Sequence, residues 1–126
     1  HAAGRAGLGV FTAAKEAGKF AIGVDSNQDD IQKGLILTSM VKRVDQAVYQ
    51  TIKDVMQGKF AAGEKVYDVA SGGIGLTDFE FTKEKIGAEN LKLVKEVEEM
   101  IAKGELVVPS NEKEYNEFIE KLKVAG

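Results

Sequence analysis

The segment Phe20-Ala21-Ile22-Gly23-Val24-Asp25-Ser26-Asn27 carries the clearest signal of the fold class. Its first five residues form a continuous apolar run, which is typical of a strand buried on both faces of a parallel sheet. The polar residues that follow are turn formers, so the strand is predicted to end there. We therefore expect Asp25 at the carboxyl end of a buried strand.

The segments around this strand alternate between helical and extended patterns. A glycine-rich loop over residues 4–9 leads into a short apolar-periodic helix that ends near Gly18. After the strand, a second apolar run covers residues 35–38, and the apolar spacing from Val41 onward predicts a helix that ends near Gly58. This alternation indicates an α/β fold with a mostly parallel sheet flanked by helices.

The second half of the chain continues with weaker extended signals and two further helices. We expect a strand over residues 65–70, a flexible loop over 71–75 and short extended pieces at 79–81 and 106–108. A long charged helix is predicted over residues 88–103, with solvated faces supported by glutamate–lysine pairs. A last amphipathic helix is predicted to begin with Ser110 or Asn111 as its N-cap.

Composition places the chain among ordinary globular domains. It has 126 residues, 44% of them hydrophobic, and a net charge of −3. Cysteine is absent, which excludes disulfides and thiol nucleophiles. The acidic balance makes nucleic acid an unexpected partner. No apolar run reaches the length of a membrane span, and His1 is best interpreted as a tag remnant without a role.

Two glycine- or acid-rich motifs fail as cofactor or metal sites. The loop Gly4-x-x-Gly7-x-Gly9 has the wrong order for a dinucleotide fingerprint and no strand before it. The acidic segment that starts at Asp25 resembles a calcium loop, but it carries Asp30 and Ile36 where glycine and glutamate are needed. We expect neither a metal nor a cofactor.

Ser39-x-x-Lys42 supplies the one enzyme hypothesis, because a lysine one helical turn away can activate a serine. The partner motifs of such hydrolases are missing, so we do not expect an enzyme. Asp25 and Lys42 are more interesting as a pair, since ligands of open α/β sheets gather where strands end. A solvated surface pair explains their positions equally well.

Four segments, taken in order, resemble the basic membrane protein family, which includes purine nucleoside receptor lipoproteins. They are Ala2-Ala3-Gly4-Arg5-Ala6-Gly7-Leu8-Gly9-Val10, Ala21-Ile22-Gly23-Val24-Asp25-Ser26-Asn27-Gln28, Leu37-Thr38-Ser39-Met40-Val41-Lys42-Arg43-Val44-Asp45 and Gly72-Gly73-Ile74-Gly75-Leu76. The resemblance covers most of residues 2–108. It implies a two-lobed, type I periplasmic-binding (flavodoxin-like) architecture, of which residues 1–126 form a single C-terminal fragment.

The resemblance also implies a function and a set of site residues. The full-length protein would be lipid-anchored outside the cytoplasm, bind a nucleoside between its lobes and deliver it to an ABC transporter permease. Asp25 matches the ribose-binding aspartate and Lys42 a cleft lysine, while the loop from Gly4 to Gly7 lines the cleft. The helix near Val41 is expected to pack in the other lobe.

Compared with the family pattern, we expect this sequence to be without the first half and, with it, the signal peptide, the lipid-bearing cysteine and the partner lobe. We therefore expect this chain to bind nucleoside poorly by itself. Exposed apolar surface and unpaired sheet edges favour self-association. A receptor for a sugar or another small polar solute remains the alternative, because an aspartate at this place serves hydroxyls generally.

Overall fold

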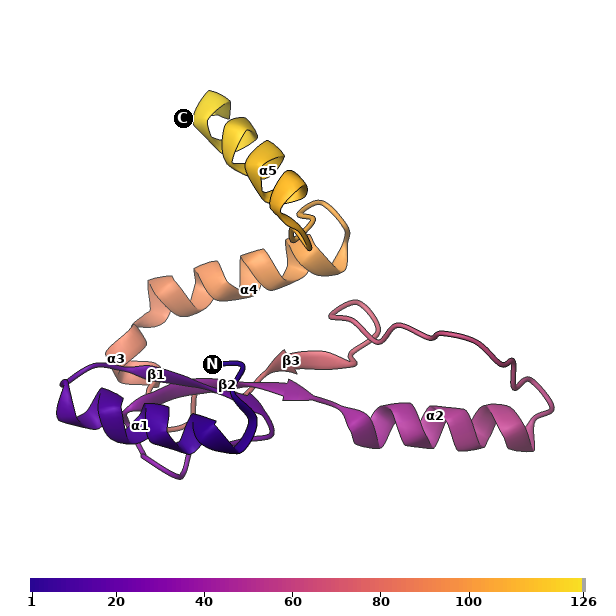
Figure 1. Cartoon of the computed structure of the whole chain (residues 1–126), viewed down its shortest axis with the longest axis horizontal. Helices are drawn as coiled ribbons and strands as arrows, with labels where there is room; N and C mark the ends of the chain where they lie inside the picture. Colours follow the sequence, from indigo (N-terminus) through magenta and orange to yellow (C-terminus); the bar gives the residue numbers. More distant parts are fainter. Residues whose placement is uncertain (126) are drawn as a thin grey trace.

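The fold is built on a sheet of three strands in the order β1-β2-β3, flanked by helices (Figure 1). The computed structural model describes the backbone of residues 1–125 and the side chains of residues 1–120. Strand β1 (Ala21–Asp25) pairs in parallel with β2 (Ile36–Lys42), and the short β3 (Ile74–Leu76) pairs antiparallel with β2. The predicted α/β class is confirmed.

The helices connect these strands and continue beyond them. They are η1 (Gly4–Ala6), α1 (Gly7–Glu16), α2 (Val44–Met56), α3 (Lys83–Ile86), α4 (Ala88–Ala102) and α5 (Glu112–Ala125). Figure 1 shows α1 lying along the sheet, while α2 extends beyond the end of β2 and a long irregular segment returns from it to β3. We call residues 43–73 the arm.

The buried core is small and lies between α1 and the first two strands. Phe11 of α1, Ala21 of β1 and Ile36 of β2 are buried together. Ala14 and Leu35 pack against this cluster from its edge. Because the large side chain of Phe11 packs against Ala21 and Ile36, the first residues of β1 and β2, it fixes how α1 lies on the sheet.

The prediction that β1 is buried on both faces is wrong. Ala21 and Gly23 are buried, but Phe20 and Ile22 are 59% and 50% exposed. Successive side chains of a strand point to opposite faces, and the core cluster with Phe11 of α1 takes up the face on which Ala21 lies. Apolar composition alone therefore did not distinguish a covered face from an open one.

The predicted strand over residues 65–70 is also wrong, because a local turn competes with sheet pairing. The Ser71 amide donates to the Asp68 carboxylate at 2.8 Å, and the Asp68 amide donates to the Ser71 hydroxyl at 2.8 Å. These bonds satisfy backbone groups that a strand would need. The strand lies later, at β3, inside the stretch predicted as a flexible loop.

Other predicted boundaries shift in similar ways. Helix α2 begins at Val44 and not at Val41, because β2 continues through Lys42. The short pieces at 79–81 and 106–108 are not strands. The long charged helix and the last helix are confirmed as α4 and α5. Asn111 serves as the N-cap of α5, since its side chain accepts the Glu114 amide at 3.0 Å.

Candidate functional site

Asp25 and Lys42, the two charged residues singled out from the sequence, meet at the carboxyl ends of β1 and β2. The Lys42 Nζ lies 2.7 Å from the Asp25 Oδ1. The parallel pairing places Asp25 beside Val41, so Lys42 is the next residue along the neighbouring strand. Their side chains are 54% and 56% exposed, which leaves both groups open to a ligand from solvent.

Asp25 has an unusual backbone conformation for a residue with a side chain. Its φ is 71°, in the left-handed region, and the amide of Ser26 donates to the carbonyl of Val24 at 2.9 Å. A bond between residues two apart around a positive φ defines the rarer, strained form of γ-turn. Such a conformation costs on the order of 1–3 kcal/mol and persists only where surrounding contacts enforce it.

A buried polar network lies directly beneath this turn. The side-chain Oε1 of Gln28 accepts a hydrogen bond from the Val24 backbone amide at 2.9 Å. The backbone amide of Gln28 donates to the Ser39 Oγ at 3.0 Å. The Ser39 hydroxyl in turn donates to the Asp29 Oδ1 at 2.6 Å. Ser39 is 0% and Asp29 is 3% exposed, so both groups depend on these bonds for their polar partners.

Sequence reasoning missed Gln28 and Asp29 as parts of the site. Gln28 entered the sequence analysis only as part of a segment that resembles the family, and Asp29 only as part of a possible calcium loop, in which alternate oxygen-bearing side chains would point to one cation. In the structure, Asp29 instead points to Ser39 of the neighbouring strand. The available signal was the polar pair Gln28-Asp29 directly after a strand end, opposite a serine within the next apolar run.

The glycine loop reaches the same end of the sheet, but its two glycines differ. Helix α1 packs on β1 and connects to it by a short turn, so its N-terminus lies near the strands' carboxyl ends (Figure 1). Gly4 is exposed, with a φ of 52°. Gly7 is buried, and a Cβ there would collide with the imidazole of His1.

His1, for which we expected no role, packs edge-on against Phe11 with the ring centroids 5.3 Å apart. The ring covers Gly7, so this glycine presents no free surface in this structure. Both imidazole nitrogens are buried without a hydrogen-bond partner among the described residues, which costs free energy.

Ser39 has the surroundings of a structural hydroxyl and not of a nucleophile. The serine–lysine hypothesis required both residues on one face of a helix, but they lie in strand β2. Residues three apart in a strand point to opposite faces. Because Ser39 is fully buried and donates to Asp29, its oxygen is not available to an external substrate.

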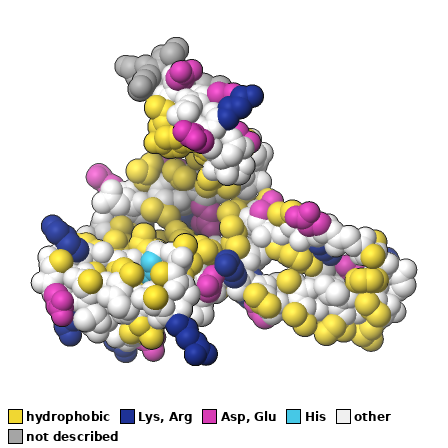
Figure 2. All heavy atoms as spheres, in the orientation of Figure 1, with side chains coloured by type: hydrophobic (Ala, Val, Ile, Leu, Met, Phe, Trp, Pro, Cys, Tyr) yellow, Lys and Arg dark blue, Asp and Glu magenta, His cyan; other side chains and the backbone are white. Residues whose placement is uncertain are grey.

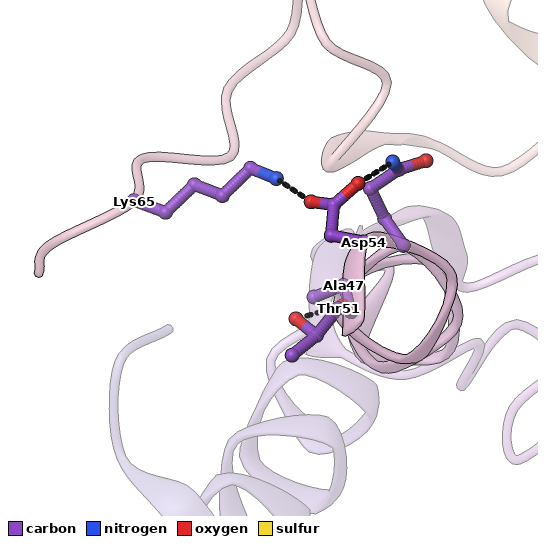
Figure 3. A network of polar contacts seen from close by, with 5 residues as sticks. Ala47, Thr51, Asp54 and Lys65 are labelled. Atoms are coloured by element: carbon purple, nitrogen blue, oxygen red, sulfur yellow. Dashed lines mark hydrogen bonds and ion pairs between the residues drawn. The ribbon is translucent and has the colours of Figure 1, made fainter. Parts of the chain in front are cut away.

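A second polar network stabilises the arm at a distance from the candidate site (Figure 3). The Asp54 carboxylate accepts from the Lys65 Nζ at 3.0 Å and from the Gln50 Nε2 at 2.6 Å. The hydrogen bond from Lys65 is the largest of the effects that lower the pKa of Asp54. This network attaches the returning segment to α2, and it has the geometry of a structural contact.

An apolar groove of about 410 Å³ lies between β3 and α4, where Figure 2 shows hydrophobic side chains around a hollow. Its lining includes Met40, Ile74, Leu76, Val94 and Val97. With Glu98 as its one charged lining residue, the groove is poorly suited to a polyhydroxylated ligand. We therefore place the candidate site at Asp25 and Lys42 instead.

Among the side chains described, those of residues 1–120, no three of the His, Asp and Glu types are grouped as a metal ion would need. None of the helices in residues 1–125 is both long and apolar enough to cross a bilayer.

The fold is that of an open α/β protein, a class in which ligands generally bind outside the carboxyl ends of the strands, where the Asp25–Lys42 pair lies. Solved structures narrow this class. A solute-binding protein of an ABC transporter system from Aeropyrum pernix K1 superposes with a TM-score of 0.68 and 30% identity, over 93% of this chain and 42% of that one. A transcriptional activator of the comK gene from Bacillus halodurans superposes with a TM-score of 0.71 and 26% identity. The match covers 82% of this chain and 35% of that one.

The chain belongs to the family described as ABC transporter substrate-binding protein PnrA-like, whose sequence profile matches residues 1–112. Basic membrane protein B of Borreliella afzelii (strain PKo) is 31% identical over 96% of this chain. A CD4+ T-cell-stimulating antigen of Listeria monocytogenes is 33% identical over 86% of it. The chain spans about a third of the length of these relatives, 34% in both cases. The resemblance noted in the sequence is confirmed.

Proposed function

We propose that this chain is the C-terminal part of an extracytoplasmic, lipid-anchored receptor that captures a small polar solute, with a purine nucleoside as the first candidate. The receptor would deliver its ligand to an ABC transporter permease and would carry out no catalysis. The observation that carries the proposal is the exposed Asp25–Lys42 pair at the carboxyl edge of the parallel strands, in a member of a substrate-binding family.

The chemistry of this pair suits adjacent hydroxyl groups. A carboxylate accepts two hydrogen bonds through its two oxygens, which matches the 2′- and 3′-hydroxyls of a ribose. The Lys42 ammonium then donates to an oxygen of the same ligand. An exposed ion pair contributes little to stability, so a ligand can open it or share it at a small energetic cost.

A sugar receptor is the second candidate, because the same carboxylate accepts hydrogen bonds from any pair of neighbouring hydroxyls. The two candidate ligands differ in that a nucleoside carries a purine base and a sugar does not. A nucleoside receptor requires aromatic faces for the purine. In our proposal those faces come from a preceding lobe, which the longer relatives have room to supply.

Calorimetric titration tests the proposal directly. Inosine, guanosine, adenosine, ribose and galactose are titrated into this chain and into a form preceded by the upstream part of Basic membrane protein B. We expect nucleoside binding by the longer form and much weaker binding by this chain alone. Asp25→Ala should weaken binding by at least about tenfold, because it removes a charged hydrogen-bond acceptor.

Asp30→Ala is the matched control, since it removes the same charge from an exposed position five residues further on. Asp30→Ala should leave the nucleoside affinity within about twofold of that of the wild type, because removing a surface charge away from the site has a small effect. Binding of sugars alone would replace the nucleoside with a sugar as the ligand. Equal losses in the two variants would reject Asp25 as the contact.

We further propose that this chain self-associates through α2. One side of this helix carries apolar side chains that are exposed in the described structure, namely Val44, Val48, Ile52, Val55 and Met56. In Figure 2 the arm that contains them stands apart from the rest of the molecule. A second copy of the chain is the partner that is always present at high protein concentration.

A further inference from the structure

The conformation of Asp25 raises the question of what holds it in place. A positive φ is uncommon for a residue with a side chain, and a strained conformation persists where the surrounding structure enforces it. The ion pair with Lys42 does not supply this restraint, because both side chains are more than half exposed. The restraint must come from the backbone contacts around the turn.

Gln28 makes these contacts on the strand side of the turn. Its side-chain Oε1 accepts the amide of Val24, the residue directly before Asp25, at 2.9 Å. Its own amide donates to the Ser39 Oγ at 3.0 Å. Gln28 therefore closes a ring from the end of β1, through the loop, to the middle of β2.

Asp29 and Ser39 anchor this ring in the interior. The Ser39 hydroxyl accepts from the Gln28 amide and donates to the Asp29 carboxylate at 2.6 Å, so it has one defined orientation. The Asp29 backbone amide donates to the Asn27 Oδ1 at 3.0 Å, which also ties Asn27 to this loop. Because Ser39 and Asp29 are buried, the loop cannot shift without leaving polar groups unpaired.

We propose that Gln28, Ser39 and Asp29 form a clamp that holds Asp25 in its γ-turn and thereby positions the carboxylate for the ligand. They are positioning residues, since none of them needs to contact the solute. This inference rests on the proposed function in one respect, namely that the Asp25 carboxylate is a ligand contact. The conformational part of the inference stands without a ligand.

NMR of this chain without ligand tests the conformational part. A positive φ brings the amide proton of a residue close to its own Hα, which gives a strong intraresidue NOE. Gln28→Met keeps the length of the side chain and removes the acceptor, so the NOE of Asp25 should weaken. Gln28→Glu keeps an acceptor oxygen and should retain it. An unchanged NOE in Gln28→Met would overturn the clamp.

Binding to the longer form tests the positioning part through a double-mutant cycle. Gln28→Met should weaken inosine binding by about tenfold when Asp25 is present, the typical effect of losing one well-placed hydrogen bond. With Asp25→Asn in place, the same change should matter by less than about twofold, because the two residues act as one unit. Equal losses in both backgrounds would show that Gln28 acts only on stability.

Gln32→Met is the control for the change from amide to thioether, four residues further along the same loop. It should leave both the NOE of Asp25 and the affinity unchanged. The two ideas fail separately. If no solute binds the longer form but Gln28→Met removes the NOE, the proposed function is wrong and the clamp is right.

Discussion

At the scale of single residues, the end of β1 depends on close packing as much as on hydrogen bonds. Gly23 lies against the Ser39 hydroxyl and the Gln28 side chain, and a Cβ at Gly23 would collide with Ser39. The glycine therefore admits the polar network into the space that a larger residue would fill. The same residue looked like an ordinary member of an apolar run in the sequence.

Gly23→Ala should lower the free energy of unfolding by about 1–3 kcal/mol, because overpacking at a buried site forces neighbouring atoms to move. Urea denaturation measures the effect. Gly9→Ala is the matched control, since the structure has nothing within 4 Å of a Cβ there. That change lies inside α1 and should raise stability by about 0.5–1 kcal/mol. A neutral Gly23→Ala would contradict the packing.

At the scale of elements, polar caps and cross-links fix segments that have little core of their own. The arm has an exposed apolar side and an internal network of Asp54, Gln50 and Lys65. Helix α5 begins with Asn111, and the Glu114 carboxylate accepts from the amide and the hydroxyl of Ser110. The first arrangement lowers the pKa of Asp54, and the second lowers the pKa of Glu114.

Lys65→Met should raise the pKa of Asp54 toward its ordinary value, because the hydrogen bond from Lys65 is the largest effect that lowers it. An NMR titration of the Asp54 carboxyl carbon measures this pKa. Lys53→Met is the control, since Lys53 contributes the smallest of the lowering effects and should change the pKa little. Equal shifts in both variants would mean that Lys65 acts only through its charge.

The start of α5 should depend on pH through Glu114. Its pKa is lowered by hydrogen bonds from Ser110 and Asn111, so the stabilisation is complete above the ordinary pKa of glutamate and is lost as pH falls through the lowered value. The 13Cα shifts of α5 should therefore show more helix in the wild type than in Glu114→Gln at pH 7, with no difference in strong acid. Equal helix content of the two proteins at pH 7 would contradict this role of Glu114.

At the scale of the whole molecule, much apolar surface has no partner within the described chain. The buried core is confined to α1 and the start of two strands, whereas α2 and the groove beside α4 expose apolar side chains. Proteins rarely leave such surface open unless another chain or lobe covers it. In our proposal, the preceding lobe covers it in the longer protein and a second copy covers it here.

Ile52→Glu should reduce self-association, because it places a charge in the apolar side of α2. Light scattering coupled to size-exclusion chromatography over a range of concentrations gives the mass of the species in solution. Gln46→Glu adds the same charge to an exposed polar position of the same helix and should leave the mass unchanged. A monomeric wild type at all concentrations would reject the proposed association.

The sequence by itself determined the α/β class, the family and the two charged residues at the strand ends. Asp25 could be found because it directly follows an apolar run. Lys42 could be found because it comes shortly after the next apolar run, and the ends of parallel strands meet at one edge. Helices α4 and α5 were predictable because their apolar spacing and caps are local features. These properties depend on residues that are near one another in the chain.

Tertiary structure decided what depends on distant partners. It showed that Ser39 serves Gln28 and Asp29, that β1 has an open face, and that Gly7 lies beneath His1. None of this follows from periodicity, because a hydrogen bond between two strands depends on their register and a covered face depends on which helix packs there. The strained turn at Asp25 belongs to this second group, since the loop residue Gln28, which bonds to Val24 beside the turn, is itself bonded to Ser39 of another strand.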